Sequence, residues 1–192
     1  MATEFGYLFA HEYEFEVLME FPPHEHERRY YYPGAAAGGS DGLIVRVTPL
    51  RGSSWIGVFA FGSRFETLMT GVFTHPDPGL LCVVSRGAGY FVKANAPENC
   101  TVIDVVPITT VKQVAEKPLL LFADFTCLSA YGKDGRIWRT RRLSWDGIEI
   151  STIDDQSVCG KGSDPTSAQA VPFCVNLTTG EASGGSAPEN YI

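Results

Sequence analysis

The sequence lacks most of the signals that identify a membrane protein or a common class of enzyme. It has no run of about 18 apolar residues, and its N-terminus has neither the basic nor the apolar stretch of a secretory signal. The phosphate-loop and Gly-x-Gly-x-x-Gly motifs are absent, and the Gly-x-Ser-x-Gly match at residues 38–42 lies in a Gly- and Ala-rich segment and is no nucleophile elbow. We therefore expect a cytoplasmic protein that does not bind membranes and needs no cofactor.

Positive charge is also scarce. The chain has 15 Lys and Arg against 22 Asp and Glu, a net charge of -7. A protein that binds the phosphate backbone needs a surplus of clustered cations, so we do not expect a nucleic-acid partner. The five cysteines are widely spread, and no two form a Cys-x-x-Cys pair. This pattern favours reduced, mostly buried thiols, as in a cytoplasmic protein.

The length and composition suit a single β domain over residues 1–192. Of the 192 residues, 44% are hydrophobic, which is enough for a sizeable core. Residues 33–42 are rich in Gly and Ala and predict a flexible loop, and the tail from Thr178 predicts fraying. The best helix candidate is residues 109–117, which end at a proline, and we expect no more than a turn there.

Strand signals fill most of the rest of the chain. Residues 12–21 alternate between apolar residues (Tyr13, Phe15, Val17, Met19, Phe21) and glutamates, as in a half-buried strand with an acidic outer face. Further short apolar segments, separated by turn residues, lie at residues 43–47, 55–61, 68–73, 80–84, 90–93, 101–106, 148–153 and 171–177. This spacing predicts an antiparallel all-β fold.

A hairpin in the middle of the chain is the clearest local signal. Residues 119–123 are apolar without alternation, which suits a strand covered on both faces, and residues 127–131 meet residues 136–143 across the turn from Gly132 to Gly135. Residues 80–92 show the same order of strand, small-residue turn and strand about forty residues earlier. That interval matches one propeller blade.

Residues 119–143 resemble the repeat of quinoprotein-type (PQQ-like) β-propellers, in which a strand, an Ala, a Gly turn and a Trp follow in order. Ala130, Gly132 and Trp138 occupy these places, although Gly132 replaces the usual Asp and the Gly-to-Trp spacing is one residue shorter. The resemblance implies a blade-like hairpin with Trp138 docked into the sheets, and it transfers no cofactor residue. A blade takes roughly 40 to 45 residues and propellers commonly have four to eight blades, so we do not expect 192 residues to form a full propeller. We expect instead a curved antiparallel sandwich or a partial-propeller-like sheet stack.

Two groups of residues offer weak catalytic or metal-binding hypotheses. His24 and His26 alternate with glutamates in a charged segment, which predicts either a solvated loop or part of a metal site, and the loop is favoured because metal sites need three or four converging ligands. His75 and Cys82 are near in sequence, but Cys82 lies in an apolar strand where thiols are usually inert.

The one concentration of positive charge is a strand that carries four arginines, at positions 136, 139, 141 and 142. Alternation places Arg139 and Arg141 opposite Trp138, so they should face solvent if Trp138 is buried. There they would receive an acidic partner, or pair with the protein's own acids such as Glu14 and Glu16.

The tyrosines at positions 30–32 are either packing residues or binding anchors. We therefore predict a non-enzymatic interaction domain, such as a scaffold, inhibitor or immunity-type protein, that binds an acidic protein through Arg139, Arg141, Tyr31 and Tyr32. The alternative is a small hydrolase or metal-dependent enzyme that uses His24, His26 and nearby carboxylates. The oligomeric state cannot be read from the sequence.

Overall fold

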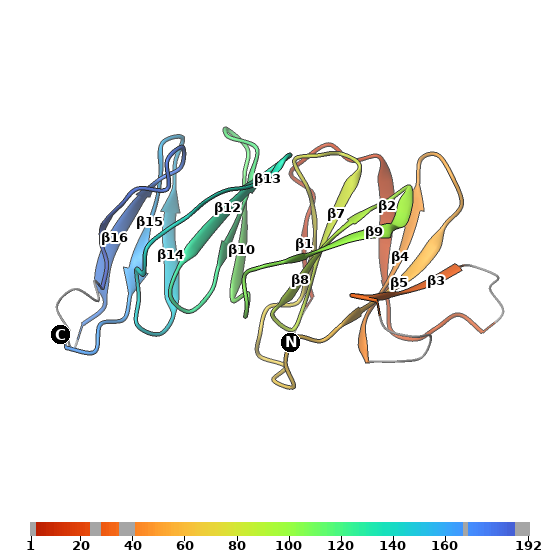
Figure 1. The fold of residues 1–192 in the computed structure, drawn as a ribbon, viewed down its shortest axis with the longest axis horizontal. Coiled ribbons are helices and arrows are strands. Elements are labelled where there is room, and N and C mark those ends of the chain that lie inside the picture. The colour runs from red at the N-terminus through yellow and green to blue at the C-terminus, as the bar shows by residue number, and fades with distance from the viewer. Residues whose placement is uncertain (1–2, 24–27, 35–40, 167–168, 187–192) are drawn as a thin grey trace. The chain divides into compact units, whose positions relative to one another are not determined.

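The computed structural model describes residues 3–23, 28–34, 41–166 and 169–186, and within them every regular element is a strand (Figure 1). The all-β prediction is therefore confirmed. The strands form four sheets and belong to two compact units, unit 1 (Met1–Pro107) and unit 2 (Ile108–Ile192). We describe each unit by itself, and the single-domain assignment stays a prediction.

Unit 1 contains two sheets, one ordered β2-β4-β5-β3 and one ordered β1-β6-β7-β8-β9. Most neighbours are antiparallel, but β3 pairs in parallel with β5 and β1 with β6. The strands are β1 (Glu4–Gly6), β2 (Tyr13–Leu18), β3 (Arg28–Tyr32), β4 (Gly42–Pro49), β5 (Trp55–Ala60), β6 (Gly71–Thr74), β7 (Leu80–Ser85), β8 (Ala88–Lys93) and β9 (Ala96–Ile103).

The alternation predicted for the first long strand is present in β2. Tyr13 is buried in the core of unit 1 and Phe15 packs against that core, whereas Glu14 and Glu16 are exposed. The prediction fails beyond Leu18, where the strand ends and Met19 is almost fully exposed. The acidic outer face is confirmed, because β2 forms an edge of its sheet and buries one side only.

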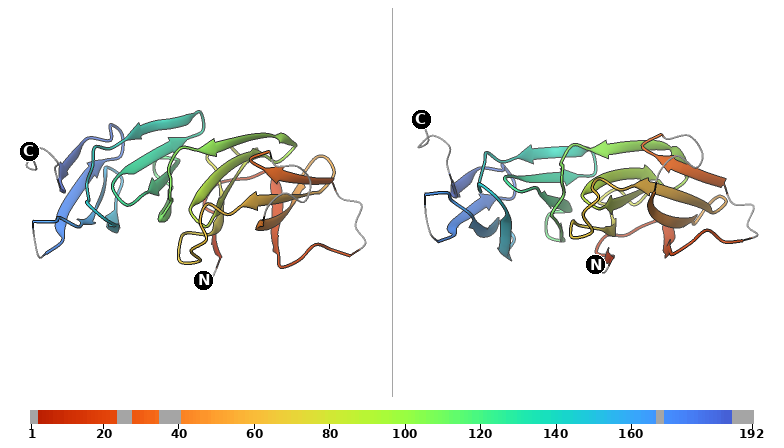
Figure 2. Two further views of the ribbon diagram at one scale, coloured as in Figure 1. Left: turned by 60° about the horizontal axis from the view of Figure 1, so that its bottom comes forward. Right: turned by 90° about the horizontal axis from the view of Figure 1, so that it is seen from below.

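Unit 2 contains two four-stranded antiparallel sheets, ordered β10-β11-β12-β13 and β14-β15-β16-β17, each in chain order like a propeller blade. Figure 2 shows the two sheets side by side, and residues from both form one core. The strands are β10 (Thr110–Val114), β11 (Leu119–Ala123), β12 (Leu128–Gly132), β13 (Gly135–Arg139), β14 (Ile148–Ile153), β15 (Ser157–Gly162), β16 (Val171–Asn176) and β17 (Ala182–Gly184).

The predicted central hairpin corresponds to β11, β12 and β13. All five residues of β11 are buried, as the lack of alternation indicated. Gly132 pairs with Gly135 across the turn, and Gly135 has a φ of +115°, which favours glycine. Residues 109–117, where no more than a turn was expected, contain a strand instead: residues 110–114 form β10 and pair along β11, so sheet pairing decides the structure of this short segment.

In each unit, one tryptophan makes a hydrogen bond from its own sheet to the next sheet along the chain. The indole Nε1 of Trp55, at the start of β5, donates to the carbonyl of Ala94 at 2.7 Å, and that of Trp138, in β13, donates to Leu177 at 2.9 Å. Both acceptors lie 39 residues further along the chain. Trp138 is buried, as the blade resemblance implied, and Trp55 has the same role in unit 1.

Two cysteines correct the prediction of reduced thiols. Cys159 in β15 lies directly opposite Cys174 in β16, with the two Cα atoms 4.1 Å apart, and their sulfurs form a disulfide. Cys82 is a buried free thiol, and Cys100 and Cys127 are partly buried free thiols. The pairing follows from the register of the two strands, which no local cysteine motif signals.

The predicted loop and tail are only partly described. Residues 35–40 of the loop at 33–42, and residues 187–192 of the tail, lie outside the described residues. In the described part of the tail, β17 pairs with β16, and Ser186 is buried and donates its amide to Leu143. The tail therefore belongs to the sheet as far as Gly184, although fraying was predicted from Thr178.

Candidate functional site

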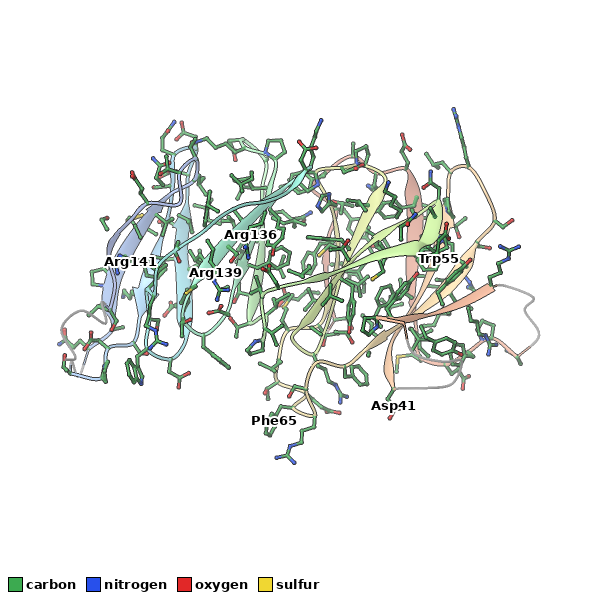
Figure 3. The ribbon with its side chains drawn as sticks, viewed as in Figure 1. Asp41, Trp55, Phe65, Arg136, Arg139 and Arg141 are labelled. Atoms are coloured by element: carbon green, nitrogen blue, oxygen red, sulfur yellow. A yellow bond between two sulfur atoms is a disulfide. The ribbon has the colours of Figure 1, made fainter. Side chains whose placement is uncertain are left out.

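The arginines of the central hairpin lie at the edge of a sheet in unit 2. Arg136 and Arg139 are exposed on β13, the last strand of its sheet, and Arg141 is exposed just beyond the strand (Figure 3). Trp138, between them, is buried. The predicted outward direction of Arg139 and Arg141 is therefore present in the structure.

Arg139 is fixed by an acid of its own unit. Its Nη2 lies 2.9 Å from Oδ2 of Asp124, whose side chain is only 8% exposed, whereas the Arg139 side chain remains 41% exposed. The other carboxylate oxygen of Asp124 accepts the amides of Thr126 at 2.6 Å and Cys127 at 2.7 Å. Asp124 thus holds the turn after β11 and the guanidinium together.

Arg141 is held by backbone carbonyls. Its Nη2 donates to the carbonyl of Gly184 at 2.7 Å, and its Nη1 donates to that of Arg142 at 3.0 Å. The acids suggested from the sequence lie in unit 1, where Glu16 pairs with Arg46 at 2.8 Å. Arg139 and Arg141 are therefore oriented by Asp124 and by main-chain groups of unit 2.

Two exposed aromatic residues lie on the neighbouring loops and were not predicted as part of this site: Phe125 follows Asp124, the partner of Arg139, and Trp145 contacts Arg142. Phe125 is 40% and Trp145 is 48% exposed, and the guanidinium carbon of Arg142 lies 5.0 Å from the centroid of the Trp145 ring. The amide of Gly147 donates to the carbonyl of Phe125 at 2.8 Å, which joins the two loops. We call Phe125, Arg139, Arg141, Arg142 and Trp145 the arginine–aromatic surface.

The tyrosines predicted as binding residues belong to unit 1. They lie on β3, which pairs in parallel with β5, although a loop was expected nearby. Tyr32 is buried, stacks on Phe59 with the ring centroids 4.8 Å apart, and donates its hydroxyl to the carbonyl of Pro97 at 2.7 Å. This places Tyr32 in the core, which corrects its assignment to an exposed surface, while Tyr31 is half-buried.

The residues considered for catalysis have no activated arrangement in the described part of the chain. His24 and His26 lie outside the described residues, and within them no three His, Cys, Asp or Glu side chains form a group that could hold a metal. Burial lowers the pKa of His75 to about 4, and its Nδ1 accepts the amide of Asp77 at 2.9 Å. Burial raises the pKa of the Cys82 thiol, which opposes formation of a thiolate nucleophile.

Comparisons with known proteins give no family for this chain. No family model matches, and no curated protein matches. Among solved structures, dihydro-heme d1 dehydrogenase NirN in complex with DHE is similar with a TM-score of 0.49 and 16% identity, over 77% of this chain and 32% of that one. The N-terminal domain of Nup159 is similar with a TM-score of 0.45 and 12% identity, over 99% of this chain and 55% of that one.

Proposed function

We propose that this protein is a non-enzymatic interaction domain and that unit 2 binds an acidic protein through the arginine–aromatic surface. The observation that carries the proposal is the exposed Trp145 with the guanidinium of Arg142 over its ring, on a loop that is hydrogen-bonded to the loop of the exposed Phe125. Tryptophan and arginine are the residues most enriched at the energetic centres of protein interfaces. A scaffold, an inhibitor and an immunity-type protein would all use such a surface.

The geometry supports binding because two of the arginines are already positioned. Asp124 holds Arg139, and the carbonyl of Gly184 holds Arg141, so a partner does not have to order these long side chains fully. A carboxylate of the partner would meet guanidinium groups that are exposed and already oriented. The net charge of -7 makes this local group of cations distinctive on the protein.

The cytoplasmic location proposed from the sequence loses one of its supports. It rested partly on reduced thiols, whereas Cys159 and Cys174 form a disulfide, a bond typical of oxidising compartments. Among the described residues, no helix is long and apolar enough to cross a membrane.

The function can be tested by comparing the proteins that three forms of the chain capture from the native source. The test form carries Arg141→Glu and Trp145→Ala. The control carries Lys93→Glu, the same charge reversal at an exposed position of unit 1. Arg139 is left unchanged because its removal would leave the buried carboxylate of Asp124 without its cation.

We expect the parent and the Lys93→Glu control to capture the same acidic partner. The double variant should capture at least tenfold less of this partner while it keeps the parent's circular dichroism spectrum. A folded double variant that captures the same proteins as the parent would show that the arginine–aromatic surface does not bind them.

A further inference from the structure

A groove of about 710 Å³ opens in unit 1, far along the sequence from the arginine–aromatic surface. Three segments form its walls: the first residues of β3, the turn between β4 and β5, and the turn from β8 into β9. Trp55, which is labelled in Figure 3, lies among its lining residues. The polar and aromatic residues of the lining include Arg28, Tyr30, Arg51, Ser53, Ser54 and Asn95.

The walls of this groove are held in place by buried hydrogen bonds. The indole of Trp55 donates to the carbonyl of Ala94, which fixes the β4–β5 turn against the β8–β9 turn. The hydroxyl of Tyr32 donates to the carbonyl of Pro97, which fixes β3 against β9. The ring of Tyr30 meets Trp55 edge-on, with the centroids 5.7 Å apart. A ligand would therefore find a site that is already formed.

The polar groups of the groove favour an anion. Arg28 and Arg51 are both exposed, and in the described part of the chain neither guanidinium has an ion-pair or hydrogen-bond partner. The hydroxyls of Ser53 and Ser54 and the amide of Asn95 add neutral donors, against a single acid, Glu98. Paired guanidiniums with hydroxyl donors match the oxygens of a phosphate or a carboxylate.

The surroundings of the tryptophan anchor differ between the two units, because in unit 2 a turn packs directly on the indole. There the turn after β16 covers the indole so closely that a Cβ added to Gly180 would lie 2.7 Å from Cγ of Trp138. The turn before Trp138 contains Lys133 and Asp134, whereas the turn before Trp55 contains Arg51 followed by glycine and two serines.

We propose that this groove binds a small organic oxyanion whose phosphate or carboxylate is held by Arg28 and Arg51 and whose apolar part lies against Tyr30. The proposal concerns unit 1 alone and does not depend on partner binding by unit 2. Phosphate and carboxylate share the chemistry that the two guanidiniums recognise, so the test compares phenyl phosphate with benzoate.

The test uses amide chemical shifts of the full chain, titrated with phenyl phosphate, benzoate or inorganic phosphate at constant ionic strength. We expect saturable shifts that centre on residues 51–54 and 94–98, and tighter binding of phenyl phosphate than of inorganic phosphate because of the Tyr30 ring. Arg28→Gln or Arg51→Gln should weaken phenyl phosphate binding roughly tenfold. Arg64→Gln, at an exposed arginine elsewhere in unit 1, should leave it unchanged.

The proposal would be overturned by shifts that do not saturate with any of the probes, by shifts spread over arginines throughout the surface, or by an equal loss of affinity in Arg64→Gln. Because Arg28 and Arg51 are exposed, both variants should keep the parent's spectrum outside the groove. Unchanged affinity in both folded variants would show that the guanidiniums do not hold the anion.

Discussion

Replacement of Trp138 by alanine should destabilise unit 2 strongly. The side chain is only 7% exposed, it packs in the core shared by both sheets of the unit, and its indole bonds to the carbonyl of Leu177. Truncation of a buried tryptophan to alanine costs about 3 to 5 kcal/mol, because the cavity adds to the lost transfer free energy. In addition, the buried carbonyl of Leu177 would lose its donor.

A second variant separates the hydrogen bond from the packing. Trp138→Phe keeps an aromatic ring in the core but removes the indole N–H, so it should cost about 1 to 3 kcal/mol for the unpaired carbonyl, plus a smaller packing loss. Trp145→Ala is the matched control, because that side chain is 48% exposed and should change stability by less than about 1 kcal/mol.

The assay is urea unfolding followed by circular dichroism, with thermal melting as a second reading. For a chain of 192 residues that unfolds as one domain, 1 kcal/mol corresponds to about 2 to 4 °C in Tm, so Trp138→Ala should melt at least about 6 °C below the parent. The reasoning is refuted if Trp138→Ala melts within a degree or two of the parent, or loses no more stability than Trp145→Ala.

Three further predictions follow from individual contacts. Gly180→Ala should lower the free energy of unfolding by more than about 1 kcal/mol, because the φ of Gly180 is +74° and the added Cβ would meet the Trp138 ring. Denaturant unfolding measures this loss, and an unchanged midpoint would contradict the prediction. The free energy of unfolding should fall by up to about 3 kcal/mol from pH 6.5 to pH 4. In this range the unfolded chain protonates His75, whereas the folded chain, in which His75 has a pKa of about 4, does not. His75→Phe should flatten this part of the pH profile, and an equally steep profile in the variant would count against this cause. Replacing Cys159 and Cys174 together with serine should cost about 3 kcal/mol, as the chain-entropy model gives for a loop of 15 residues, and titration of only three thiols in the unfolded, unreduced parent would confirm the disulfide.

The parts of the fold that sequence analysis predicted are those set by local patterns. The outward direction of Arg139 and the burial of Trp138 follow from alternation along one strand beside a glycine turn. Trp55 has the same role, but its strand is buried at five successive positions and shows no alternation that would single it out. Pairing of Cys159 with Cys174 depends on the register of β15 and β16, which no short segment encodes.

Only part of the candidate site was predicted, because the rest depends on contacts between segments that are distant in the sequence. The outward arginines come from strand periodicity, but the contact between Arg139 and Asp124 depends on how the turn after β11 folds back toward β13. The exposure of Phe125 depends on that same turn. Tyr32 was misassigned because its burial results from parallel pairing of β3 with β5, a contact between segments separated by more than twenty residues.

The most direct test of the arginine–aromatic surface is to place a photo-cross-linking amino acid, p-benzoylphenylalanine, at Phe125 or at Phe65. Phe65, labelled in Figure 3, is an exposed phenylalanine of unit 1 that serves as the matched control. In extract from the native source, the account predicts that position 125 forms a covalent adduct with an acidic protein, that position 65 does not, and that Arg141→Glu abolishes the adduct at position 125. The same adducts from both positions, or an adduct at position 125 that persists with Arg141→Glu, would contradict it.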